Sequence, residues 1–134
     1  MNNIFKILLV SIVGLFVLAG CRGGTAVYNV PTSEVGVQKG TSEDQVYQAI
    51  KTAGSQLGWI ITKTKPGLAQ GQLNIRTHMA TVEIPYSTTS YAINYKNSMN
   101  LGYDSTKQTI HPNYNGWVTN LDNAIKVQLS QYID

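Results

Sequence analysis

The sequence predicts an α+β domain: a four-stranded antiparallel meander with two helices on one face, in the order α-β-β-β-β-α. Apolar residues recur with helical spacing at both ends of segment 41–134, and between these ends they alternate with a period of two. The turns between the alternating stretches are too short for parallel crossovers, so neighbouring strands must be antiparallel. Each helix has one apolar stripe, so we expect both to cover the same face of the sheet.

The first helix is marked by signals at both of its ends. Ser42 and Gln45 form a capping-box pattern, and Gly58 is placed to end the helix in a left-handed conformation. Gly54 lies inside the pattern, where glycine costs about 1 kcal/mol relative to alanine. We therefore expect a close contact at Gly54. The apolar stripe comprises Val46, Ile50, Ala53 and Leu57.

Between the helical patterns the sequence predicts strands joined by short turns. Apolar and polar residues alternate, as in Leu73-Asn74-Ile75-Arg76, so each strand has one apolar face. Pro66-Gly67 favours a tight turn between the first two strands. The strands are expected at 59–64, 68–76, 79–85 and 90–99.

The polar faces of these strands form a first candidate surface. If the second strand extends past Arg76, Arg76 and His78 lie together on the face away from the helices. Lys96 of the fourth strand points the same way. We therefore expect a polar binding surface around Arg76, His78 and Lys96. The alternative is a solvated face on which Arg76 pairs with Glu83 across a hairpin.

Tyrosines are concentrated in the second half of the chain, where they can stack on sugars or anchor an interface. Alternation places Tyr91 and Tyr95 in the core, on the same face as Asn97. Tyr103 and Tyr114 lie in or beside a loop, where no period requires burial. We therefore expect Tyr103 and Tyr114 to be available for contacts.

The C-terminal part is predicted to consist of a loop and a second helix. Segment 100–113 is expected to be a long loop or small hairpin that turns near Asp104. The helix should be capped by Asn113 or Asn115 and run to about Gln131. Its apolar stripe comprises Trp117, Leu121, Ala124, Ile125 and Leu129.

The N-terminus carries a processing signal. Lys6 precedes an apolar run over 7–19 that ends in Leu18-Ala19-Gly20-Cys21. This ending resembles the lipobox of bacterial lipoprotein signal peptides. The resemblance implies cleavage before Cys21, a diacylglyceryl thioether on Cys21 and acylation, such as with palmitate, of its amino group. Arg rather than Asp follows at position 22, which by the same resemblance implies the outer membrane, facing the periplasm.

The domain organisation follows from this signal. We expect a signal peptide over 1–20, a lipidated N-terminus and flexible tether over 21–40, and a single periplasmic domain over 41–134. Within the tether, segment 27–30 can pair as a short edge strand. Cys21 is the only cysteine, so no disulfide is expected.

A second resemblance covers the mature chain. The segments Asn100-Leu101-Gly102-Tyr103-Asp104 and Ile110-His111-Pro112-Asn113-Tyr114-Asn115-Gly116-Trp117, with Arg76-Thr77-His78, resemble segments of a group of small proteobacterial lipoproteins. The resemblance implies a fold and an envelope location, but no particular activity.

The charge of the chain argues against a nucleic-acid partner, and the spacing of its motifs argues against an enzyme. The formal net charge is +3, with no run of Lys or Arg for a phosphate backbone. His78 and His111 lack the spacing of zinc ligands, so no metal or cofactor is expected. Ser98, Asp104 and His111 are near in sequence, but no nucleophile elbow surrounds the serine.

We therefore expect a non-enzymatic interaction or accessory module of the cell envelope, anchored in the membrane through Cys21. Its partner would be an envelope protein, which requires an exposed apolar patch. The alternative is a binder of small ligands or peptidoglycan fragments, which requires a pocket between the open sheet face and loop 100–113. A hydrolase with a histidine base is a third hypothesis. The candidate contact residues are Arg76, His78, Lys96, Tyr103, His111 and Tyr114.

Overall fold

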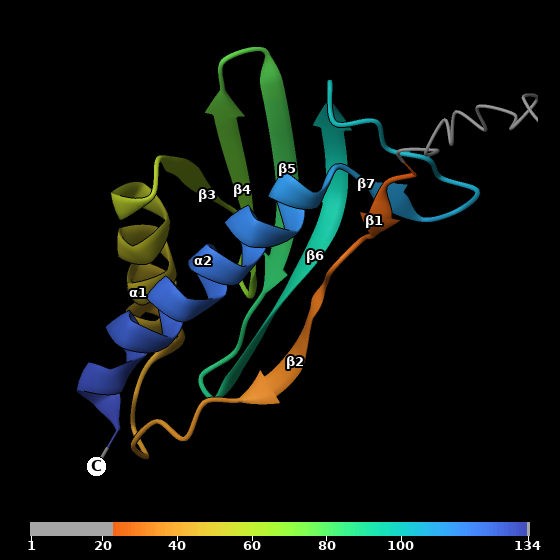
Figure 1. The fold of residues 1–134 in the computed structure, drawn as a ribbon. Helices are drawn as coiled ribbons and strands as arrows, with labels where there is room; N and C mark the ends of the chain where they lie inside the picture. The colour runs from red at the N-terminus through yellow and green to blue at the C-terminus, as the bar shows by residue number, and fades with distance from the viewer. Residues whose placement is uncertain (1–22, 134) are drawn as a thin grey trace, which may run out of the picture.

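The computed structural model describes residues 23–133, so the predicted signal peptide and Cys21 lie outside the described residues (Figure 1). The helices are α1 (Glu43–Gln56), α2 (Pro112–Leu129) and the short 3-10 helix η1 (Ser130–Tyr132). The strands are β1 (Thr25–Ala26), β2 (Val30–Glu34), β3 (Trp59–Lys65), β4 (Leu68–Ile75), β5 (His78–Pro85), β6 (Ser90–Met99) and β7 (Thr109–Ile110). Within 23–133, neither α1 nor α2 is long and apolar enough to cross a membrane.

The main sheet has five antiparallel strands in the order β2-β6-β5-β4-β3. The structure thus confirms the α+β class and the meander β3 to β6, and it adds β2 as a fifth strand at the edge. Pro31 is tolerated in β2 because an edge strand does not need every backbone donor. A separate ribbon pairs β1 with β7.

The prediction of a tether over 21–40 is corrected by β1 and β2. Over 25–34 the chain runs along the domain and pairs first with β7 and then with β6 (Figure 1). The glycines of this segment suggested flexibility, but strand pairing is non-local, so the partners are not visible in the local composition. The folded unit therefore begins before residue 41.

One face of the sheet and both helices form a single hydrophobic core. The register sets Leu73 beside Trp59 and Ala80, which places these side chains on one face. Figure 1 shows α2 crossing in front of the sheet, with α1 alongside it. Buried residues of the sheet face are Trp59, Ile61, Ala69, Leu73, Ala80, Val82, Ile84, Tyr91 and Ile93.

The start of α1 and the turn after it follow the local signals. The Gln45 amide donates to Ser42 Oγ at 3.1 Å, and the Ser42 amide donates to Gln45 Oε1 at 2.8 Å, which confirms the capping box. Gly58 has a φ of 85°, as predicted. A Cβ at Gly54 would lie 2.5 Å from Ile61 Cγ1, so the expected close contact is with β3.

A β-bulge in β6 changes which side chains face the core. Tyr95 lies opposite Val82, but Asn97 lies opposite Thr81, so Lys96 is the additional residue. The prediction that Asn97 shares a face with Tyr91 and Tyr95 is therefore wrong, because the alternation is interrupted between them. The bulge could not be found from the period alone, since Lys96 and Asn97 are both polar.

We predict opposite effects of alanine at the two helical glycines. Gly54→Ala should lower the free energy of unfolding by about 1 kcal/mol, because crowding against Ile61 exceeds the gain in helix propensity. At Gly116 of α2 nothing lies within 4 Å of an added Cβ, so Gly116→Ala should raise it by up to about 1 kcal/mol. Urea unfolding measures both. Equal changes of the same sign would contradict the contact at Gly54.

Candidate functional site

A hollow of about 630 Å³ opens between the end of β6, the loop that follows it and the segment before β2. Its volume lies within the range of small-ligand sites. We call it the loop hollow. It is lined by Val27, Asn29, Tyr95, Lys96, Asn97, Ser98, Asn100, Leu101, Gly102, Tyr103 and Gln108.

The loop hollow exists because β6 is longer than its neighbour β2. The last pair between these strands is Val30 with Ile93, and the chain before Val30 then turns toward β7 (Figure 1). Asn29 Oδ1 accepts from the Tyr95 amide at 2.8 Å in place of a strand partner. From Lys96 onward, no strand among residues 23–133 pairs with this edge of β6. The open edge becomes one wall of the hollow.

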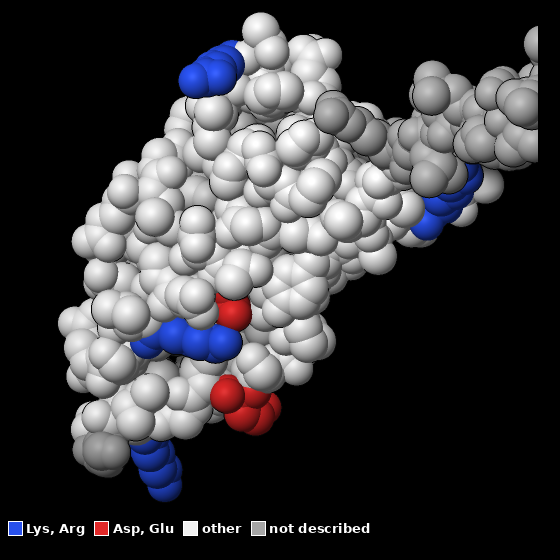
Figure 2. Space-filling model, viewed as in Figure 1, with Lys and Arg blue, Asp and Glu red and all other residues white. Residues whose placement is uncertain are grey.

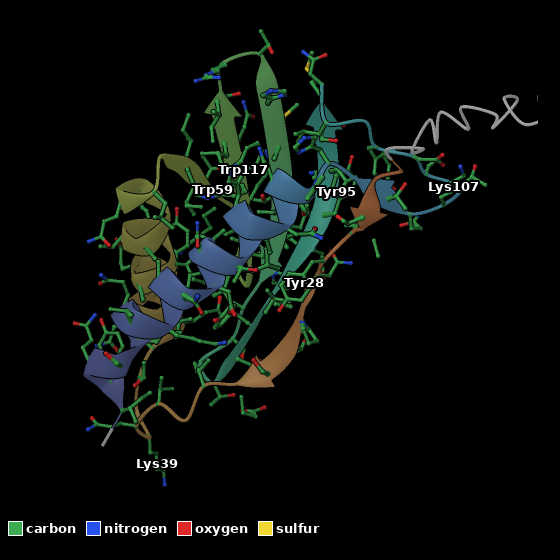
Figure 3. All side chains as sticks on the ribbon, viewed as in Figure 1. Tyr28, Lys39, Trp59, Tyr95, Lys107 and Trp117 are labelled. Atoms are coloured by element: carbon green, nitrogen blue, oxygen red, sulfur yellow. The ribbon has the colours of Figure 1, made fainter. Side chains whose placement is uncertain are left out.

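Three tyrosines form the aromatic part of the site. The Tyr95 and Tyr103 rings stack with centroids 4.3 Å apart, and the Tyr114 ring stands nearly perpendicular to Tyr95 at 5.6 Å. Figure 3 shows Tyr95 on β6, near the start of the loop. Tyr95 and Tyr103 are partly exposed, and both line the hollow. Their rings therefore offer the hollow an aromatic surface.

Tyr114 does not have the exposure that the sequence predicted. Its side chain is fully buried, because the first turn of α2 packs onto the core. Burial raises the pKa of the Tyr114 hydroxyl, and Tyr95 raises it further. Within the described part of the chain this hydroxyl has no hydrogen-bond partner. Tyr114 therefore supports Tyr95 from inside and does not present a contact to a ligand.

Four amide side chains line the hollow, and each uses one end to bind the fold. Besides Asn29 Oδ1, Asn97 Oδ1 accepts from the Ser98 amide at 2.8 Å. Asn100 Nδ2 donates to the Thr77 carbonyl, and Gln108 Nε2 donates to the Ser105 carbonyl, both at 2.7 Å. These bonds orient the amides.

The opposite amide ends are available to a ligand. The donors Asn29 Nδ2 and Asn97 Nδ2 and the acceptors Asn100 Oδ1 and Gln108 Oε1 have no hydrogen-bond partner among residues 23–133. The hollow thus combines oriented donors and acceptors without a net charge on these groups.

Lys96 is the one cation that lines the hollow. Its charge is balanced by an acidic side chain on the open face of the sheet. Lys96 Nζ lies 2.9 Å from Gln70 Oε1 and 3.3 Å from Glu83 Oε1. Lys96 therefore lies on the open face, as the sequence predicted. Glu83 pairs with Lys96, so the expected alternative pair of Arg76 with Glu83 is not formed.

Arg76 and His78 do not share the open face, and this expectation is corrected. Ile75 lies opposite His78, so Arg76 and Thr77 form the turn between β4 and β5, with Arg76 at a φ of 55°. The register places His78 on the same face as Ala80, toward the helices. A left-handed turn residue could not be expected from an arginine, since few non-glycine residues adopt this conformation.

His78 holds the start of the loop instead. Its Nδ1 donates to the Asn100 carbonyl at 2.6 Å, while Asn100 donates back to Thr77. The tip of the β4–β5 hairpin is therefore bonded to Asn100, the first residue after β6. Arg76 is exposed beside this junction and does not line the loop hollow.

His111 is the cap of α2, in place of the predicted Asn113 or Asn115. Its Nδ1 accepts from the Asn113 amide at 3.1 Å, and its own amide donates to the Leu101 carbonyl at 2.8 Å. His111 also lines a second hollow of about 450 Å³ with Gly23, Gly24, Leu101 and others. His78 and His111 thus bind the consecutive loop residues Asn100 and Leu101.

The other residues considered for catalysis have structural partners. Ser98 Oγ bonds Tyr95 Oη at 2.8 Å, and Asp104 Oδ1 accepts from the Thr106 and Lys107 amides at 2.9 Å. The bonds from Lys107 and Thr106 hold the pKa of Asp104 below its usual value. Over residues 23–133, no group of three or more His, Cys, Asp or Glu is placed to hold a metal ion.

Comparison with known protein families, with curated proteins and with solved structures finds no match for this chain.

Sequence reasoning missed the four amides of the hollow. Asn29, Asn97, Asn100 and Gln108 come from different segments, so no spacing connects them. Asn100 alone carried a local signal, since Asn is the non-glycine residue that most readily adopts a positive φ, and its φ is 56°.

We predict that two buried tyrosine hydroxyls contribute differently to stability. Tyr91 Oη donates to the buried Asp122 Oδ1 at 2.5 Å, so Tyr91→Phe should lower the free energy of unfolding by about 2 kcal/mol. The Tyr114 hydroxyl has no hydrogen-bond partner among the described residues, so Tyr114→Phe removes an unsatisfied buried group and should raise the free energy of unfolding by about 1 kcal/mol. Urea unfolding measures both; a large loss in Tyr114→Phe would contradict this assignment.

We predict that Asn100 stabilises the loop through both its conformation and its side chain. Asn100→Gly keeps the positive φ but removes the bond to Thr77, so it should cost about 1 kcal/mol of unfolding free energy. Asn100→Ala should cost about 1 kcal/mol more, because alanine is strained at this φ. Thermal unfolding distinguishes them, and an equal loss in both variants would exclude a conformational contribution.

Proposed function

We propose that this protein is a non-enzymatic binding module of the bacterial cell envelope, anchored by lipid on Cys21, and that the loop hollow binds a neutral polar ligand such as a sugar of a peptidoglycan fragment. The observation that carries the proposal is the hollow itself. It provides the pocket that a small-ligand binder requires, at the loop where the sequence placed it.

The chemistry of the lining favours a sugar. A sugar presents hydroxyl groups that both donate and accept, and the available amide ends of Asn29, Asn97, Asn100 and Gln108 do the same. The Tyr103 ring, stacked on Tyr95, offers an apolar surface with a polar tip. Lys96 is compensated by Glu83, so the lining has no strong preference for an anion.

The surface supports a small ligand better than a large protein partner. The exposed large apolar side chains come from several different segments: Tyr28, Leu57, Ile60, Met99, Val127 and Ile133. Figure 2 shows a face with few charged side chains.

The histidines support a role in binding more than in hydrolysis. The geometry commits one ring nitrogen of His78 to Asn100 and one of His111 to the α2 cap. A general base must reach the proton that it abstracts, and neither ring lines the loop hollow. The envelope address rests on the lipobox resemblance at Cys21.

We predict that the lipidated protein in detergent binds soluble disaccharide-peptide fragments of peptidoglycan, measured by isothermal titration calorimetry. Tyr103→Ala should raise the Kd about tenfold, because it removes the ring that the hollow presents. Asn97→Ala should raise it by a similar factor. Tyr28→Ala is the matched control, because Tyr28 is exposed but does not line the hollow, and its Kd should be unchanged.

The outcomes separate the hypotheses. Binding that is unaffected at Tyr103 and Asn97 would place the ligand outside the loop hollow. If no fragment binds, and a photo-crosslinking residue at Tyr103 captures one dominant protein in intact cells, the ligand proposal is replaced by a protein partner.

A further inference from the structure

We propose that the lipid anchor holds the domain with one defined end, formed by residues 101–112 and the β1–β7 ribbon, directly against the membrane surface. The inference rests on the proposed function, because it requires the anchor at Cys21. It goes beyond that function by assigning an orientation and a lipid surface as the partner of this end.

The N-terminal segment 25–27 is hydrogen-bonded to β7 and to the loop before it. Thr25 and Ala26 pair with Ile110 and Thr109, and the Val27 amide donates to the Gln108 carbonyl at 2.9 Å. A Cβ at Gly24 would lie 2.8 Å from the Ile110 carbonyl oxygen, so this glycine permits the close approach.

Asn115 of α2 closes this attachment. Its Oδ1 accepts from the Tyr28 amide at 3.0 Å, and its Nδ2 donates to the Ala26 carbonyl at 2.9 Å. One side chain therefore bonds the segment at two backbone positions. Residues 25–28 are therefore held against the domain and do not act as a free linker.

The remaining chain is too short to let the domain move far from the anchor. Only residues 22–24 separate Cys21 from Thr25. Fully extended, these steps span at most about 14 Å, whereas a tether over 22–40 would reach about 60 Å. The end of the domain that carries β1 and β7 must then stay next to the lipid to which Cys21 is attached.

The chemistry of this end suits a layer of lipid headgroups. Figure 3 places Lys107 at the tip of the loop, where its side chain is exposed. Asp104 is the acidic residue of the loop, and its carboxylate accepts the Thr106 and Lys107 amides. The exposed neighbours of Lys107 at this tip are the neutral, polar residues Ser105, Thr106 and Gln108, so the tip can contact headgroups but not insert into the apolar layer.

The orientation is tested with the full lipidated protein in vesicles of phosphatidylethanolamine and phosphatidylglycerol that contain a nitroxide on a lipid headgroup. Thr106→Cys and Thr88→Cys each receive a thiol-reactive fluorophore. Both threonines are exposed, and they lie near opposite ends of β6, which is 10 residues or about 33 Å long. Lipidation consumes the Cys21 thiol, so each variant carries one label.

We expect the nitroxide to quench the label at 106 several-fold more than the label at 88. Equal quenching, or stronger quenching at 88, overturns the orientation and leaves the lipid anchor intact. A protein that does not sediment with vesicles, and whose Cys21 still reacts with the fluorophore, overturns the anchor and the orientation together.

A matched glycine pair tests whether the ribbon fixes the orientation. Gly24→Val should reduce the difference between the two labels by at least half, because the side chain would collide with the Ile110 backbone and open the ribbon. Gly23→Val is the control, since nothing lies within 4 Å of an added Cβ, and the difference should remain. An unchanged difference in Gly24→Val would show that the ribbon does not set the orientation.

Discussion

The pairing of β6 is the constraint on which the candidate site depends. β6 has β5 beside it on one edge, but on the other edge β2 accompanies it only as far as Ile93. Beyond that point the bulge at Lys96 places Lys96 and Asn97 on the same open face of the sheet. A β2 strand that continued would fill the loop hollow with backbone. The hollow is thus a consequence of a strand pair that ends early.

The segment before Val30, which no longer pairs with β6, also connects the hollow to the N-terminal part of the chain. The segment that no longer pairs with β6 has other backbone partners. Thr25 to Val27 find them in β7 and in the loop before it, and Asn115 binds two further groups. The loop that lines the hollow is therefore also the support of the N-terminal segment, so the hollow and the attachment of this segment share one structure.

The sequence predicted the elements whose signals are local. The Ser42 capping box, Gly58 and the period-two pattern of β3 to β6 are each decided by neighbours within a few residues. The rest depends on distant partners. β2 needs β6, and the cap by His111 needs an imidazole where Asn113 and Asn115 were the commoner capping types. For the site, the sequence indicated the loop and Tyr103 but not the segment before β2, whose Val27 and Asn29 complete the lining of the hollow.

The two histidines show why residue type alone does not predict which residues line the hollow. An imidazole suggests proton transfer, yet it is also a rigid group with two separate hydrogen-bonding atoms. His78 uses one to hold Asn100, and His111 uses one to begin α2. The groups of the hollow that remain available are amide ends. Each amide bonds the protein through its oxygen or its nitrogen and leaves the other atom available, because the two atoms form hydrogen bonds independently. In this hollow the bound end of each amide sets the direction of its available end, so the fold itself orients these donors and acceptors.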